Sequence, residues 1–136
     1  MASVTNLITD ENRPYWDGLK QGELRLQKCS DCGHIRHPIR WICPHCLRER
    51  FTWARMSGQG AVESFIWYFE RPVAIPDFSL EAPYNAAAIR LEEGPLLLSN
   101  VLGSSFGVLR VGDVVSACFD VLDDDWKLLR FAVNAR

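Results

Sequence analysis

The residues with the clearest chemical potential are four cysteines arranged as two close pairs. Two residues separate the members of each pair, a spacing that lets both sulfurs of one turn face the same metal ion. Two such turns supply four thiolates, the tetrahedral shell of closed structural zinc sites. The sequence therefore predicts a structural zinc ion held by Cys29, Cys32, Cys43 and Cys46.

Other uses of these cysteines are weaker hypotheses. Iron in a rubredoxin-type site needs the same four sulfurs and is the main chemical alternative. Disulfides are disfavoured because the chain has five cysteines and because Met1–Thr5 shows no secretory leader. A closed shell has no open coordination position, so we expect it to hold structure and to catalyse nothing. The fifth cysteine, Cys118, lies in an apolar run and is expected in the core.

The segments around the cysteine pairs predict a small zinc ribbon. The ten residues Gly33–Ile42 between the pairs are enough for two short strands and a turn. We expect Leu24–Lys28 to run as a strand into the first pair. After the second pair, Phe51–Arg55 should return as the partner strand.

Upstream of the ribbon, Asp10–Lys20 carries capping residues and an early proline, which are signals for the start of a helix. Tyr15, Trp16 and Leu19 recur at helical spacing and form an apolar stripe. This stripe either packs on its own domain or docks on a partner. Tyr15 and Trp16 are therefore candidates for partner binding.

The remainder of the chain reads as consecutive strands after the linker Ser57–Gly60. The triple leucine Leu96–Leu98 predicts a buried strand. Five strands in about 75 residues cannot bury both faces of an open sheet, so we expect closure into a small OB-type barrel. The predicted strands are Ala61–Phe69, Tyr84–Leu91, Leu96–Leu102, Val114–Leu122 and Lys127–Asn134.

The predicted fold class is thus mainly β, with a short N-terminal helix and a four-cysteine zinc ribbon before a five-stranded OB-fold barrel. We divide the chain into a tail and helix (1–22), the ribbon (23–56) and the OB-fold domain (57–136). One long connection, Glu70–Pro83, contains three prolines and several apolar side chains. Connections of this length are often functional, so Ile75, Phe78 and Leu80 are further candidates for partner binding.

The charge distribution bears on the class of partner. Residues 20–55 carry eight Lys or Arg and three Asp or Glu, whereas residues 56–136 carry six and eleven. Zinc ribbons and OB barrels can bind single-stranded nucleic acid, which is the alternative function, and the strand Phe65–Phe69 offers aromatic rings. However, such binding needs a positive track beside the rings, and the barrel half is acidic. We therefore expect no nucleic acid as partner, and the Phe65–Phe69 aromatics should be core and interface residues.

Membrane insertion and independent catalysis are also disfavoured. No apolar run approaches the roughly 20 residues that span a bilayer, so we expect a soluble, cytoplasmic protein without membrane contact. His34, His37 and His45 all lie in the ribbon, and no Ser-His-Asp order is apparent. We therefore expect no catalytic residue in this chain.

Several segments, taken in order, resemble the DUF35 family, in which a rubredoxin-like zinc ribbon is joined to an OB-fold. The resemblance covers nearly all of the chain from Pro14 onward. The matching segments are Pro14–Leu19, Gly22–Cys29, His37–Pro38 through Cys43–Cys46, Gly58–Phe65, Gly94–Val101 and Val111–Val115.

The resemblance implies a non-catalytic accessory subunit. DUF35 proteins work beside thiolase-superfamily enzymes that form or cleave carbon–carbon bonds next to an acyl-CoA thioester, as in acyl transfer or retro-aldol cleavage of a side chain. The reactive residues then belong to the partner. On this interpretation the basic ribbon contributes to acyl-CoA binding, because arginines suit the phosphates and an indole can stack on adenine. The candidate residues are Arg36, Arg40, Trp41 and Arg48; the alternative is that the arginines only balance the thiolate charge.

Overall fold

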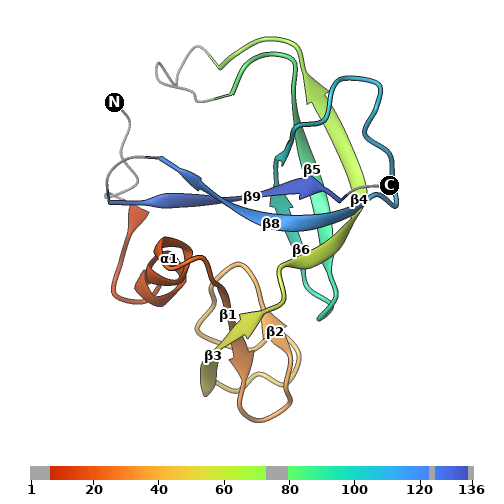
Figure 1. Ribbon diagram of the computed structural model, residues 1–136. Helices are drawn as coiled ribbons and strands as arrows, with labels where there is room; N and C mark the ends of the chain where they lie inside the picture. The colour runs from red at the N-terminus through yellow and green to blue at the C-terminus, as the bar shows by residue number, and fades with distance from the viewer. Residues whose placement is uncertain (1–6, 73–79, 123–124, 135–136) are drawn as a thin grey trace.

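The computed structural model describes residues 7–72, 80–122 and 125–134. These residues form one short helix and two β-sheets (Figure 1). No helix in these ranges has the length and apolar character needed to cross a bilayer. The elements are α1 (Arg13–Lys20), β1 (Leu24–Cys29), β2 (Ile35–Arg36), β3 (Phe51–Met56), β4 (Gln59–Tyr68), β5 (Tyr84–Leu91), β6 (Leu96–Ser99), β7 (Val101–Leu102), β8 (Val114–Val121) and β9 (Lys127–Val133).

The ribbon is a three-stranded antiparallel sheet in the order β2-β1-β3. Strands β1 and β3 pair along their full length, from Leu24 opposite Met56 to Cys29 opposite Phe51. Both ribbon strands predicted from the sequence are therefore confirmed. The ribbon lies below the larger sheet in Figure 1, and α1 lies beside both.

Helix α1 begins three residues later than predicted. Before it, Thr9 and Asn12 bond to each other's backbone: the Thr9 N–H donates to Asn12 Oδ1 (2.7 Å), and the Asn12 N–H donates to Thr9 Oγ1 (3.3 Å). The capping side chain is therefore used in a turn, and residues 10–12 remain outside the helix. The helix ends before Gly22, whose φ of 76° is a conformation that glycine adopts without strain.

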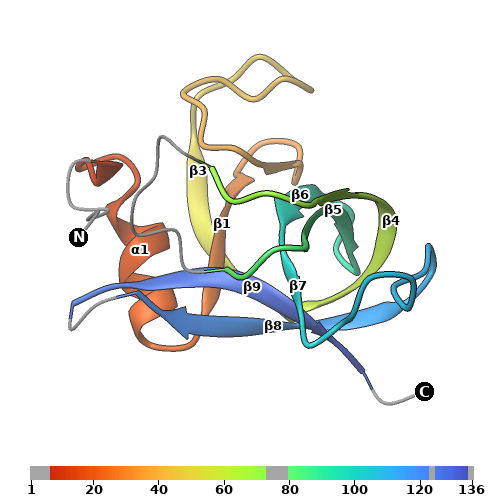
Figure 2. The same ribbon diagram turned by 90° about the horizontal axis from the view of Figure 1, so that it is seen from above.

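The larger sheet is OB-like, but its strands differ from the prediction in one respect. Its order is β6-β5-β4-β8-β9-β7, and its two edge strands are halves of one predicted strand, separated only by Asn100. Before Asn100 the chain pairs antiparallel with β5, and after it the chain pairs parallel with β9. Figure 2 shows β7 leading from β6 to β9. The segment β6–β7 thus joins the two edges of the sheet by pairing first with β5 and then with β9. Among the described strands, no single continuous ladder closes the sheet.

Asn85 holds this change of partner in place. Its side chain is 3% exposed and bonds to both backbone groups of Val101: Oδ1 accepts from the N–H (2.8 Å), and Nδ2 donates to the carbonyl (2.9 Å). In return, Asn100 Nδ2 donates to the Asn85 carbonyl (2.5 Å). The Asn85 amide therefore makes the two hydrogen bonds to the Val101 backbone that a neighbouring strand would otherwise make.

The ribbon and the barrel share one apolar core. Leu24, Leu26 and Met56 of the ribbon strands belong to the same buried cluster as Ile89 and Leu91 of β5. The cluster continues through β4, β6, β7, β8 and β9, and Tyr15 of α1 packs against it. Because the core is common to both parts, the ribbon is fixed in orientation relative to the barrel.

We expect Asn85→Ala to lower the free energy of unfolding by about 2–4 kcal/mol, because two buried backbone groups of Val101 would lose their partners. Urea denaturation followed by circular dichroism measures this change. Ser64→Ala, at an exposed position of the adjacent strand β4, is the matched control and should change the stability by less than about 0.5 kcal/mol. Equal stability of the two variants would contradict the role given to Asn85.

Candidate functional site

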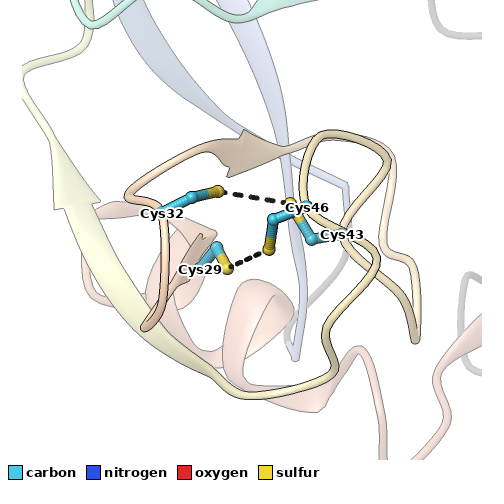
Figure 3. A group of neighbouring side chains, drawn as sticks. All are labelled: Cys29, Cys32, Cys43 and Cys46. Atoms are coloured by element: carbon cyan, nitrogen blue, oxygen red, sulfur yellow. Dashed lines mark hydrogen bonds between the residues drawn. The ribbon is translucent and has the colours of Figure 1, made fainter.

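The four predicted metal ligands converge in space. Cys29 ends β1 and Cys32 follows in the turn, whereas Cys43 and Cys46 lie in the loop between β2 and β3. Their sulfurs all lie within 4.8 Å of one another, with Sγ–Sγ distances of 3.5 Å for Cys29–Cys46 and 3.6 Å for Cys32–Cys43 (Figure 3). A tetrahedral zinc ion with bonds of about 2.3 Å would hold its sulfurs about 3.8 Å apart. The geometry therefore fits one zinc-sized ion.

Both cysteine turns have the same backbone hydrogen bonds. In each turn the first cysteine donates its N–H to the carbonyl five residues later and accepts at its carbonyl from the residue four positions later. These bonds are Cys29 to His34 and Cys43 to Arg48 (both 2.8 Å), Gly33 to Cys29 (3.0 Å) and Leu47 to Cys43 (2.9 Å). At the equivalent positions, Gly33 has a φ of 79° and Leu47 a φ of 65°. The two turns thus present their sulfurs through one repeated backbone shape.

The two thiols of the first pair differ in their pKa. The backbone N–H of Cys32 lowers the pKa of Cys29 to about 6. The N–H of His34 acts in the same direction on Cys32, but burial and the neighbouring sulfurs outweigh it and raise the pKa of Cys32 to about 12. Four thiolates at this separation repel one another, so they are all deprotonated together only around a positive ion. A donor set made only of soft sulfur suits zinc.

Arg36 has a structural role that the sequence did not reveal. It is 1% exposed, and its guanidinium lies 5.2 Å from the centre of the Phe51 ring. Its Nη atoms donate to five backbone carbonyls of the segment that carries the second cysteine turn. These carbonyls belong to Arg40, Trp41, Arg48, Glu49 and Arg50, at 3.1–3.3 Å. The prediction that Arg36 contacts acyl-CoA is therefore corrected, because a ligand cannot reach its guanidinium.

The other three candidates for acyl-CoA binding are at the surface, and Arg48 does not line the cavity that Arg40 and Trp41 share. Arg48 pairs with Asp31 (3.6 Å), as does Arg50 (2.7 Å). The bond from Arg50 is the main reason that the pKa of Asp31 is lowered. Arg40 and Trp41 line a separate small cavity, and Trp41 is 71% exposed.

The apolar stripe of α1 packs on the chain itself. Tyr15 contacts the shared core, and burial raises its pKa to about 12. The Trp16 ring lies edge-on to Trp126, with centroids 6.3 Å apart, and Lys20 Nζ lies 4.3 Å from the centre of the Trp126 ring. Of the two interpretations of the stripe, packing on its own domain is therefore the one that the structure supports. Both residues are half-buried, and the contact of Tyr15 and Trp16 with a partner stays a prediction.

The remaining predicted positions are less informative. Ile75 and Phe78 lie outside the described residues, and Leu80 is half-buried beside a small cavity next to Trp67. Cys118 is also half-buried, on β8, and burial raises the pKa of its thiol. It is therefore less enclosed than expected of a core residue.

One apolar surface was predicted only in part, through Tyr68 of the run Phe65–Phe69, whose aromatic rings we expected in the core or at an interface. The outward side of β4, β5 and β6 carries several exposed large apolar side chains, and we refer to it as the barrel face. Leu98 is 82% exposed and Ile66 55% exposed. By register, Ile66 lies opposite Ala86, and Ala88 lies opposite Leu98. The face consists of Ile66, Tyr68, Tyr84, Ala86, Leu96 and Leu98, together with Ala88, which is only 8% exposed.

The prediction that Leu96–Leu98 is a buried strand was wrong for two of its three residues. Only Leu97 is buried, because successive side chains of a strand point to opposite sides of the sheet. The strict alternation of strands, applied to the triple leucine, could have predicted this exposure.

Comparison with known proteins agrees with this architecture. Residues 16–52 match the family described as the rubredoxin-like zinc ribbon domain of ChsH2, and residues 53–120 match the C-terminal OB-fold domain of ChsH2. A DUF35 domain-containing scaffold protein of Methanocaldococcus jannaschii is 34% identical over 99 residues, which are 72% of this chain and 68% of that protein. The chain belongs to the DUF35 family.

Two further relatives carry names that refer to enzymes. A probable enoyl-CoA hydratase alpha subunit of Thermomonospora curvata is 32% identical over 121 residues, and the match covers 89% of this DUF35 chain but only 36% of that relative's length. A solved structure described as an Ltp2-ChsH2(DUF35) aldolase superposes with a TM-score of 0.81 at 29% identity. That alignment covers 93% of this chain and 96% of the other.

We expect the purified DUF35 protein to contain about one zinc ion per chain, and Cys43→Ser to lose it, because a serine oxygen is a poor ligand in a thiolate shell. Elemental analysis of the metal after gel filtration measures both. Cys118→Ser removes a cysteine outside the cluster and should keep the ion. A folded wild-type protein without metal, or equal metal loss in both variants, would contradict the assignment.

Proposed function

We propose that this chain is a non-catalytic accessory subunit that binds and supports a thiolase-superfamily enzyme acting on acyl-CoA thioesters. The proposal covers the formation or cleavage of a carbon–carbon bond beside the thioester. It is supported by relatives described as a scaffold protein, as an alpha subunit of a CoA-ester hydratase and as part of an aldolase. The single observation in this chain that carries it is the exposed barrel face.

The barrel face has the character of a protein interface. Large exposed apolar patches on soluble domains mark surfaces that bind other molecules. Here Ile66 lies opposite Ala86 on the β4 side, and Leu98 lies opposite Ala88 on the β6 side. Both large side chains are exposed, so a partner could pack against them. Tyr68 and Tyr84, stacked with centroids 5.1 Å apart, add aromatic surface at one end.

The chemistry of the same face argues against nucleic acid. OB-folds that bind oligonucleotides use the face of their second and third strands, which correspond here to β5 and β6. Arg90 is the one cation within β4, β5 and β6, and its guanidinium is bonded to Glu63 (3.1 and 3.2 Å). A single strand needs a continuous positive track, so an apolar protein surface fits this face better.

The histidines offer no catalytic arrangement. His34 and His45 stack on each other with centroids 5.6 Å apart, and both are exposed. Burial lowers the pKa of His37, which lies beside Tyr15. Across residues 7–72, 80–122 and 125–134, no hydrogen bond joins an imidazole to a hydroxyl, thiol or carboxylate side chain. We therefore assign the reactive residues to the partner.

Most of the coenzyme A contact is also assigned to the partner. Of the arginines predicted to bind its phosphates, Arg36 is buried and Arg48 pairs with Asp31. Only Arg40, beside Trp41, remains for an anion, and a nucleotide with several phosphates needs more positive charge than one guanidinium.

The test is reconstitution with a thiolase-superfamily subunit identified by affinity purification from the native cell. We expect the chain alone not to turn over acyl-CoA thioesters and the mixture to do so. Leu98→Glu should weaken association at least about tenfold, because a charge would replace an apolar contact at the interface. Val121→Glu, at a similarly exposed valine of β8, is the matched control and should bind as the wild type does. Turnover by the lone chain at the rate of the complex would contradict the proposal, as would tight binding of single-stranded oligonucleotides at physiological salt.

A further inference from the structure

The ribbon carries a small aromatic pocket that is separate from the barrel face. Its volume is about 210 Å³, and its walls include the rings of Trp41, Phe51 and Trp53. The Phe51 and Trp53 rings lie edge to face, with centroids 5.8 Å apart. Trp41 is mostly exposed and stands in the loop before the second cysteine turn. Three aromatic side chains around one hollow form a surface that attracts cations.

The charged residues of the pocket strengthen this preference. Asp10 and Glu11 line it, and Arg40 is the one basic residue among the described residues that line it. The buried guanidinium of Arg36 lies outside the pocket, 5.2 Å from the centre of the Phe51 ring. Within the described part of the chain, no hydrogen bond or ion pair involves the carboxylate of Asp10 or of Glu11. These two carboxylates are therefore available to a positively charged ligand.

The backbone of the pocket is held in place before any ligand arrives. The Arg40 N–H donates to Oε1 of Gln27 (2.9 Å), a residue of β1 that is 2% exposed and also lines the pocket. From the other direction, the buried guanidinium of Arg36 bonds to the carbonyls of Arg40 and Trp41. The Trp41 loop is thus fixed at its backbone by two buried side chains, so a ligand would not have to order it.

We propose that this pocket binds the cationic end of an arginine or lysine side chain presented by a protein partner. The aromatic rings would contact the guanidinium or ammonium group, and Asp10 and Glu11 would pair with its charge. The identity of the partner as the catalytic subunit rests on the proposed function, whereas the preference of the pocket for a cation does not. The pocket therefore gives the ribbon a docking role of its own, in addition to that of the barrel face.

The main competing occupant is the adenine nucleotide end of coenzyme A, which would also use Trp41. Its phosphates would approach Asp10 and Glu11, and Arg40 is the one described lining residue whose charge would offset the repulsion. The two occupants make opposite predictions for one variant. Removing the Arg40 guanidinium should improve the binding of a cation and weaken the binding of a phosphate.

The experiment is a titration of the 136-residue, zinc-loaded chain, labelled with ¹⁵N, followed at the indole N–H signals of Trp41 and Trp53. The probe is n-butylguanidinium, its neutral counterpart is n-butylurea, and the nucleotide probe is adenosine 3′,5′-bisphosphate. We expect n-butylguanidinium to shift both indole signals and to bind at least about fivefold more tightly than n-butylurea. Trp41→Ala and Glu11→Gln should each weaken it about two- to fivefold, and Arg40→Ala should strengthen it.

Trp41 and Glu11, the two positions where substitution should weaken binding, both lie at the surface. An unchanged amide spectrum elsewhere in the chain confirms that each variant is folded. The proposal is overturned if n-butylguanidinium fails to bind or if n-butylurea binds equally well. It is also overturned if adenosine 3′,5′-bisphosphate binds and Arg40→Ala weakens the binding of that bisphosphate. Because the titration needs no partner, its outcome is independent of whether the catalytic subunit assigned above is correct.

Discussion

The convergence of four cysteine sulfurs on one point is the constraint on which the ribbon depends. Between β1 and β3 the only regular element is the two-residue strand β2, so few backbone ladder bonds hold this part of the chain. Two groups of side chains hold these loops in place of ladder hydrogen bonds, and we call them the two centres of the ribbon. One is the sulfur cluster, whose thiolates need a cation to stay together, and the other is Arg36, which gathers five carbonyls of the same loop.

These two centres also determine what the ribbon displays. The loop fixed by Arg36 and Gln27 carries Trp41, and β3 carries Phe51 and Trp53. Through Leu24, Leu26 and Met56 the ribbon shares its core with the barrel. The aromatic pocket and the barrel face are therefore parts of one packed body. A partner that contacts both would meet them at a fixed separation, which suits a scaffold better than two linked modules.

The sequence predicted the features that depend on local pattern. Cysteine spacing identified the metal site, and the runs of β-branched, aromatic and other apolar residues placed the strands to within two residues at most ends. It did not predict the features that depend on distant partners. The change of strand partner at Asn100 needs the Asn85 amide, and the burial of Arg36 needs carbonyls up to 14 residues away. Trp16 likewise packs on Trp126, more than a hundred residues later in the chain, which helical spacing alone could not show.

Hydrogen exchange measured with and without the metal tests the central claim most directly. After a chelator has removed the ion, we expect the amides of β2 and of the loops between β1 and β3 to lose their protection, while the β8–β9 pairing keeps it. That result would show that the ion holds the ribbon and that the barrel stands without it. Unchanged protection of the ribbon amides after verified loss of the metal would contradict the account.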